Sequence, residues 1–306
     1  MQWNFDGPNL SSIKNLVTTE GTTLEEVLND NNLGQSIRYE TEEVIDFLSR
    51  KDIIKKLLIW SITAQDDEDP NYYRYSRIST GILMTNCIEL QNAYVDSNVL
   101  PSAFRNFFRL EPEEHQLICG NYQRLVEHFI KLTRGDILDQ FPELYSQIIE
   151  RLHVLPFRIL LLDILTDLRQ YLENPDSILE QITNVIRKAG PSGLGAISLL
   201  FELLRNEKNP FMANTMVEIV DSLIEFSISS TSTPLYKTQA YMLTEFIIQK
   251  YPSVDFTKVL NKYEEKVDFL SESIDGIAIF RVYTNSHLDI AFRRFFSNIS
   301  HSVLGH

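Results

Sequence analysis

Residues 41–63 read TEEVIDFLSRKDIIKKLLIWSIT and lie between LEEVLNDNN at 24–32 and NYYRYSRISTGILMTN at 71–86. An acidic run, DDEDP at 66–70, separates the last two segments. Apolar residues recur through the stretch at three- and four-residue steps, which is typical of amphipathic helices. The stretch 23–86 therefore predicts three helical segments around one acidic loop, and it contains no catalytic motif. It favours the start of a helical stack that binds another protein.

Local signals place the helices of this stretch. Thr23 and Glu26 have the spacing of a capping box, which predicts a helix that begins there and ends near residue 28. From residue 36 to residue 50 the apolar side chains share one face, and they predict a single helix. Two further helices are predicted over Ile53–Ile62 and Tyr72–Met84. Trp60 lies off the apolar stripe, and we expect it to pack between helices.

The rest of the chain repeats this pattern of helices joined by short turns. No segment shows the alternation of a strand, and prolines stand at or near several predicted helix starts, where the missing N–H costs nothing. Short connections predict antiparallel neighbours. The expected fold class is all-α, an armadillo/HEAT-like α-solenoid of stacked antiparallel helix pairs in one repeat domain, residues 1–306. The other predicted helices are Asn9–Thr18, Ile88–Val95, Val99–Leu110, Glu111–Leu132, Glu143–His153, Phe157–Leu172, Ser177–Lys188, Ser192–Arg205, Phe211–Phe226, Leu235–Lys250, Phe256–Leu270, Ile274–Tyr283 and His287–Ile299.

Composition limits the partners that the protein can have. The 306 residues carry a formal net charge of −14, which opposes non-specific binding to nucleic acid or to an anionic membrane. Cys87 and Cys119 form no CxxC or Cys/His cluster, which indicates free thiols in a reducing compartment. We expect no signal peptide and no membrane span. A cytoplasmic location, with the nucleus as a second one, is the expectation.

The acidic run Asp66–Asp69 is the sharpest candidate for chemistry. Carboxylates one helical turn apart hold Mg²⁺ in all-helical isoprenoid synthases. Here Pro70 and polar flanks predict a loop, and no second acidic motif follows at helical spacing, so a solvated loop is the favoured interpretation. The six histidines have neither HxxxH nor HExxH spacing, and the glycines at 190–195 follow a helix rather than a strand. The sequence therefore predicts no catalytic residue, no metal and no cofactor.

A cluster of tyrosine and arginine stands at the start of the predicted helix Tyr72–Met84. Tyrosine and arginine are enriched at protein interfaces, although tyrosines at helical spacing are also ordinary core residues. Together with the acidic loop, this cluster forms the candidate partner-binding site. Its members are Asp66, Asp67, Asp69, Tyr72, Tyr73, Arg74 and Arg77.

The segment from about Trp3 to Asn86 resembles the SAPS-domain family, the regulatory subunits of protein phosphatase 6. The residues that carry the resemblance are the aromatic start at 3–5, TTLEEVLNDNNLGQS at 22–36, VIDFLSRKDII at 44–54 and YRYSRISTGILMTN at 73–86. Two departures stand out: Ser76 replaces a proline that is usual in the family, and residues 50–52 replace a turn that contains proline. After about residue 200 only the helical character is similar.

The resemblance implies a non-catalytic helical-repeat subunit. It would bind a type-2A-like Ser/Thr phosphatase catalytic subunit and direct it to substrates, and it leaves open a third scaffold or ankyrin-type subunit. Two alternatives of other classes remain. One is a generic armadillo-type adaptor for another protein partner, and the other is an all-helical Mg²⁺-dependent prenyl-type enzyme that would use Asp66.

Overall fold

The computed structural model describes residues 10–63, 71–111, 114–172, 174–188, 190–228 and 233–263. Every regular element in these ranges is a helix. The chain divides into two compact units, Met1–Leu144 and Tyr145–His306. The single repeat domain over residues 1–306 stays a prediction. The predicted helices Ile274–Tyr283 and His287–Ile299, and the end of Phe256–Leu270, lie outside the described residues.

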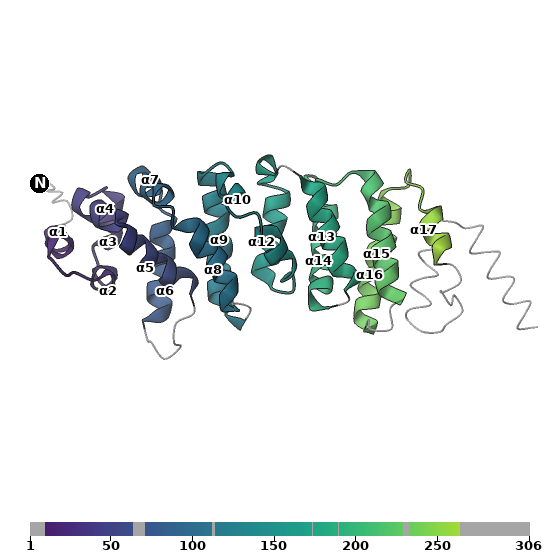
Figure 1. The fold of residues 1–306 in the computed structure, drawn as a ribbon, viewed down its shortest axis with the longest axis horizontal. Helices are drawn as coiled ribbons and strands as arrows, with labels where there is room; N and C mark the ends of the chain where they lie inside the picture. Colours follow the sequence, from purple (N-terminus) through teal and green to yellow (C-terminus); the bar gives the residue numbers. More distant parts are fainter. Residues whose placement is uncertain are drawn as a thin grey trace, which may run out of the picture. The chain divides into compact units, whose positions relative to one another are not determined.

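The described residues of the first unit form ten α-helices, and an eleventh, α11 (Leu144–Ile149), spans its boundary. Figure 1 shows these helices following one another along the unit. The consecutive helices α5 and α6 pack against each other, and both contact α9. The elements of this unit are α1 (Ser11–Thr18), α2 (Leu24–Leu28), α3 (Leu33–Arg38), α4 (Glu42–Ser49), α5 (Lys51–Ile62), α6 (Tyr72–Leu83), α7 (Ile88–Asp96), α8 (Leu100–Phe107), the 3-10 turn Phe108–Leu110, α9 (Gln116–Leu132) and α10 (Asp136–Asp139).

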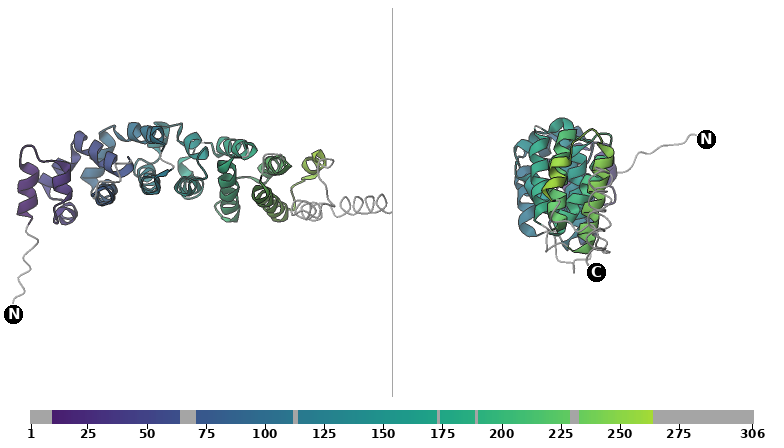
Figure 2. Two further views of the ribbon diagram at one scale, coloured as in Figure 1. Left: turned by 90° about the horizontal axis from the view of Figure 1, so that it is seen from below. Right: turned by 90° about the vertical axis from the view of Figure 1, so that its right-hand side faces the viewer.

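The second unit is a stack of helix pairs in two layers (Figure 2, left). Consecutive helices α13 and α14 form one pair, and α15 and α16 form the next, while α14 also contacts α12 and α16 within its own layer. Such pairwise stacking confirms the predicted all-α, armadillo/HEAT-like α-solenoid class. The elements are α12 (Leu155–Leu165), the 3-10 turn Arg169–Tyr171, α13 (Pro175–Arg187), α14 (Pro191–Arg205), the 3-10 turn Ala213–Thr215, α15 (Met216–Ile228), α16 (Pro234–Lys250) and α17 (Thr257–Lys262).

Proline positions set several of these helix starts, as the sequence predicts. Pro175, Pro191 and Pro234 are each the first residue of their helix. Other boundaries were predicted wrongly. The helix expected from Glu111 begins only at Gln116, since Glu111 has a left-handed backbone, φ 47°. Other helices are also shorter than expected, among them α8, α11, α12 and α15.

The predicted helix over residues 36–50 is two helices, which is the main correction to the first unit. Glu40 adopts a left-handed φ of 49°, and it ends α3. The Thr41 N–H bonds to the Ser36 carbonyl at 2.9 Å and the Glu40 N–H to the Ile37 carbonyl at 3.1 Å, which is the Schellman arrangement of a helix end. Because α4 then starts in a new direction, Ile37 does not share a face with the apolar residues of α4.

The capping box at the start of α2 is confirmed. The Glu26 N–H donates to Thr23 Oγ1 at 3.3 Å, and the Thr23 N–H donates to the Glu26 carboxylate at 2.8 Å. Together these bonds satisfy two amides that a helix start leaves unpaired. The box fixes a helix of only five residues, whose leucines Leu24 and Leu28 are buried.

Thr23→Ala is expected to lower the free energy of unfolding of the first unit by about 1 kcal/mol, because the variant loses the cap. Urea unfolding followed by circular dichroism measures the effect. Thr18→Ala is the matched control, since the Thr18 hydroxyl bonds only to carbonyls of its own helix. Equal midpoints for Thr23→Ala and Thr18→Ala would show that the capping box adds no stability.

A buried amide joins three helices of the first unit. Asn121 of α9 is 5% exposed, and its side-chain nitrogen donates to the Ser61 carbonyl of α5 and to Ser76 Oγ of α6, both at 2.9 Å. Ser61 lies in the last turn of α5, where carbonyls have no partner within the helix. Ser76 thus serves as a hydrogen-bond acceptor in the core.

Candidate protein-binding site

The partner-binding residues predicted from the sequence fall into three environments. Asp66, Asp67 and Asp69 lie outside the described residues. Tyr72, at the first position of α6, is 3% exposed and belongs to the core. The other members, Tyr73, Arg74 and Arg77, are exposed on the same helix, Tyr73 by 62%. The structure therefore leaves three of the four described candidates accessible.

The buried face of α6 determines which side chains point outward. The Tyr75 ring meets the Trp60 ring edge-on at 4.9 Å, and its hydroxyl accepts a hydrogen bond from Asn29 Nδ2 at 2.7 Å. Trp60 itself donates from Nε1 to the Glu25 carboxylate at 2.8 Å, which confirms its predicted place between helices. These contacts attach α6 to α2 and α5. Residues 73, 74 and 77 are consequently left on its free side.

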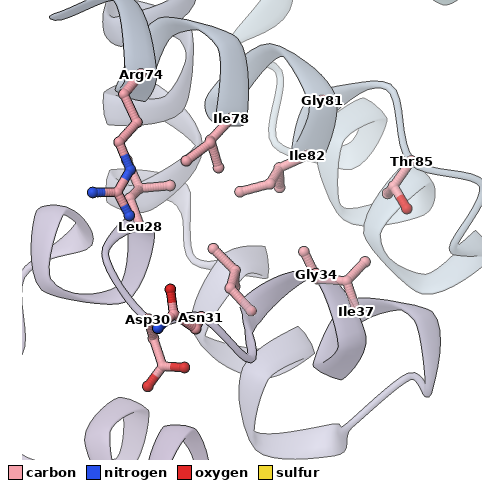
Figure 3. Close-up of a pocket in the computed structure, with 11 residues that line it drawn as sticks. Leu28, Asp30, Asn31, Gly34, Ile37, Arg74, Ile78, Gly81, Ile82 and Thr85 are labelled. Atoms are coloured by element: carbon pink, nitrogen blue, oxygen red, sulfur yellow. The ribbon is translucent and has the colours of Figure 1, made fainter. Parts of the chain in front are cut away.

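A groove lies between α3 and α6, with a cavity volume of about 440 Å³ (Figure 3). Its lining includes the buried Leu28, Leu33 and Ile82, and the half-buried Ile37 of α3 and Ile78 of α6 lie on opposite walls. Gly34 and Gly81 leave the walls open, because no heavy atom lies within 4 Å of a Cβ added at either position. The remaining lining residues are Asp30, Asn31, Arg74 and Thr85.

Charge is concentrated at one end of this groove. Arg74 and Asp30 both lie there, while Ile37, Ile82 and Thr85 line the other end (Figure 3). Asp30 Oδ1 accepts a hydrogen bond from the Asn32 N–H at 2.7 Å. Arg74 makes no ion pair with any residue that the structure describes. The groove can thus offer a guanidinium and an apolar surface to the same ligand.

Two further hollows have different chemistry. One lies in the first unit between α5 and α8, has a volume of about 370 Å³, and is mainly apolar, with Ile59 47% exposed at its edge. The other lies in the second unit beside α13, has a volume of about 580 Å³, and is lined by polar groups that include Asp176, Glu180 and Arg187. Neither contains a residue that the sequence predicted for the partner-binding site.

The described ranges contain no cluster of three or more histidine, cysteine, aspartate or glutamate side chains that could hold a metal ion. Cys87 and Cys119 are buried and form no disulfide. Asp66, the residue on which the prenyl-type alternative depends, lies outside these ranges. No helix among the described residues has the length and apolar character needed to cross a membrane.

A serine and a histidine meet where α14 begins. The two atoms, His153 Nδ1 and Ser192 Oγ, are 3.0 Å apart, and Ser192 Oγ donates to the Glu150 carbonyl at 2.5 Å. Because its hydrogen is used by that carbonyl, Ser192 accepts from the histidine rather than donating to it. The pair joins the start of α14 to the connection before α12, which is a structural role.

The fold changes the ionisation of His128 on α9. Burial lowers its pKa, the charge of Lys131 lowers it further, and Glu127 opposes the shift. Its Nε2 atom is buried without a hydrogen-bond partner among the described residues. The folded state therefore holds the neutral imidazole more strongly than an unfolded chain does.

The lowered pKa of His128 predicts that the stability of the folded protein depends on pH. Between the lowered pKa and the unfolded value of about 6.5 the unfolded chain binds more protons, so stability rises with pH. The stability that the neutral His128 contributes is complete above about pH 6.5. It is lost as the pH falls through the pKa of His128 in the folded protein. In a His128→Leu variant the melting temperature should depend less on pH between about 7.5 and 5 than in the parent protein. Thermal unfolding at a series of pH values tests this, and parallel curves for both proteins would contradict it.

The stacked helix pairs define an all-α helical-repeat protein. No family model matches the chain, and no solved structure matches it. The chain is similar to serine/threonine-protein phosphatase 6 regulatory subunit 2 of Mus musculus, with 22% identity over 132 residues, 42% of this chain and 14% of that protein. The corresponding human subunit gives the same identity and the same coverage.

Regulatory subunit 3 of Gallus gallus is 22% identical over 141 residues, which is 45% of this chain and 16% of the relative. The chain thus spans about a seventh of the length of the curated relatives it matches. All three relatives are named as regulatory subunits, a role that agrees with the non-catalytic interpretation of the sequence.

The sequence predicts the helix that forms one wall of the groove, but it predicts neither the groove nor the separate helix of the other wall. Arg74 and Ile78 were recognised as part of α6, and their helix was placed correctly. The opposite wall, residues 30–37, was divided between a turn and a helix that continued to residue 50. The helix of this wall ends at the left-handed Glu40, and no local sequence signal marks that position.

Proposed function

We propose that this protein is a non-catalytic regulatory or scaffold subunit that binds a type-2A-like Ser/Thr phosphatase catalytic subunit of the protein phosphatase 6 class and directs it to substrates. The observation that carries the proposal is the similarity to three regulatory subunits of that phosphatase. The stacked helices support it, because such arrays present extended surfaces to folded partners. Residence in the cytoplasm, with the nucleus as a second location, belongs to the same proposal.

Affinity purification of the full chain from its native cells, followed by mass spectrometry of stoichiometric partners, tests this function. A type-2A-like catalytic subunit in the eluate is the expected result. Its absence, together with another abundant partner, would favour the generic adaptor. Direct binding to purified phosphatase 6 catalytic subunit then establishes whether the contact needs a third protein.

We place the contact at the N-terminal end of α6 and the acidic loop before it. Tyr73, Arg74 and Arg77 are exposed there, whereas Tyr72 supports α6 from the core. An exposed aromatic ring beside two guanidinium groups is a common composition for an interface anchor.

Charge reversal tests the contribution of the acidic loop to this contact. The triple variant Asp66→Lys, Asp67→Lys and Asp69→Lys is expected to weaken association with the catalytic subunit by about tenfold or more, because a carboxylate cluster complements a basic partner surface. Biolayer interferometry at two salt concentrations measures the loss, which should shrink at high salt. The control is Asp176→Lys with Glu180→Lys on α13. Unchanged affinity of the triple variant would remove the loop from the interface.

A further inference from the structure

We propose that the groove between α3 and α6 binds a short segment of the partner phosphatase that carries apolar side chains and, at one end, a carboxylate. The inference rests on the proposed function, since the occupant is part of the catalytic subunit. It names the surface and the chemistry by which that partner is recognised.

The walls of the groove favour an apolar occupant. Ile37 and Ile78 are only half buried, although both line the groove together with the buried Leu28 and Leu33. Covering these isoleucines removes apolar surface from water, which favours binding. The cavity of about 440 Å³ lies within the usual range of ligand sites. It has room for a few side chains of a peptide.

The charged end favours a carboxylate on that occupant. Arg74 lies at this end with no ion-pair partner among the described residues, and the exposed Arg77 is less than one helical turn further along α6. Arginine recognises carboxylates with two parallel hydrogen bonds. The Asp30 carboxylate points away from Ile78 and Ile82 (Figure 3), so it does not occupy the space beside them. In a chain of net charge −14, this cationic end is locally complementary to an acidic segment.

The direction of α6 sets the order of these features. Arg74, Ile78 and Ile82 follow one another at steps of four residues along one face of α6, and Thr85 comes just after the helix ends at Leu83. From residue 74 to residue 82 the helix rises about 12 Å. The bound segment therefore places its carboxylate near the N-terminal end of α6 and its apolar side chains toward Ile37 and Ile82.

Gly81 allows the groove to be filled without disturbing the helix. A Cβ at this position meets no heavy atom within 4 Å, and the residue lines the groove. Leucine is also a better helix former than glycine. Gly81→Leu should therefore keep the fold, and its side chain should occupy the space of the incoming apolar group. The matched control is Gly120→Leu on α9, another helical glycine with nothing within 4 Å of an added Cβ.

Arg74→Glu tests the charged end, and Arg124→Glu on the exposed side of α9 is its control. Binding of each variant to purified phosphatase 6 catalytic subunit is measured by biolayer interferometry, with melting temperatures as the check of folding. We expect Gly81→Leu and Arg74→Glu each to raise Kd by about tenfold or more, and the two controls to bind like the parent chain. High salt should reduce the effect of Arg74→Glu and leave that of Gly81→Leu unchanged.

The outcomes separate this inference from the proposed function. If the parent chain and all four variants bind the catalytic subunit equally, the proposed function is supported, but the groove is not the binding site. If the parent chain does not bind at all, the proposed function fails and the inference fails with it. A photocrosslinking residue, p-benzoylphenylalanine, placed at Ile78 identifies the occupant. A crosslink to an acidic, apolar segment of the catalytic subunit supports the proposal, whereas a crosslink to residues 66–70 of this chain or to a second copy overturns it.

Discussion

Gly195→Ala is expected to lower the free energy of unfolding of the second unit by about 3 kcal/mol or more, as severe overpacking does. A Cβ at this position of α14 would lie 2.1 Å from the Leu152 carbonyl oxygen and 2.8 Å from the His153 nitrogen. Both atoms are backbone, so no side chain can rotate to make room. The helix must move away from the connection before α12, and it loses packing there as it moves.

Hydrogen exchange read by mass spectrometry localises this effect. Peptides from α14 and from residues 150–153 should exchange faster in Gly195→Ala, while peptides from the first unit provide an internal reference. Gly120→Ala is the matched control, because its added methyl group meets nothing within 4 Å, and it should be neutral or more stable by about 0.5–1 kcal/mol. If α14 is protected from exchange in Gly195→Ala as well as in the wild type, Gly195 does not lie close to the backbone of residues 152–153 in solution.

Asn121→Leu is expected to destabilise the first unit by about 2–4 kcal/mol, because two buried acceptors lose their donor. The Ser61 carbonyl and Ser76 Oγ each accept from this one amide nitrogen at 2.9 Å. Leucine has a similar branched shape and supplies no donor. Chemical unfolding monitored by tryptophan fluorescence is a suitable measurement, since Trp60 lies on α5 one residue before Ser61.

Ser76→Ala separates the two hydrogen bonds of Asn121. It removes one acceptor and leaves the bond to the Ser61 carbonyl, so a loss of about 1 kcal/mol is expected. In the double variant the two effects should not add, because the partners are in contact. Strictly additive losses would mean that Asn121 and Ser76 do not interact, and that the buried junction of α5, α6 and α9 depends on other contacts.

Much of the local structure followed from the sequence alone. The capping box at Thr23, the prolines at the starts of α13, α14 and α16, and the limits of α6 were all readable. These signals act between residues at most four positions apart, where helix geometry relates sequence directly to contact. For the same reason the all-α class was predictable. The resemblance between residues 3–86 and regulatory subunits of protein phosphatase 6 was also visible in the sequence, and the relatives that the chain matches are such subunits.

Only the tertiary structure decided which helices meet. Glu40 takes a left-handed conformation that is costly for a residue other than glycine. The packing of α3 against α4 maintains this conformation. No local sequence pattern therefore predicts that a helix ends at Glu40. The groove joins residues 30–37 to residues 74–85, and Asn121 reaches partners 60 and 45 positions away. Gly195 is needed because a distant carbonyl passes beside it. Contacts between residues so far apart in the sequence depend on how whole helices pack. A periodic pattern of apolar residues predicts which face of a helix is buried, but it does not predict which other helix covers that face.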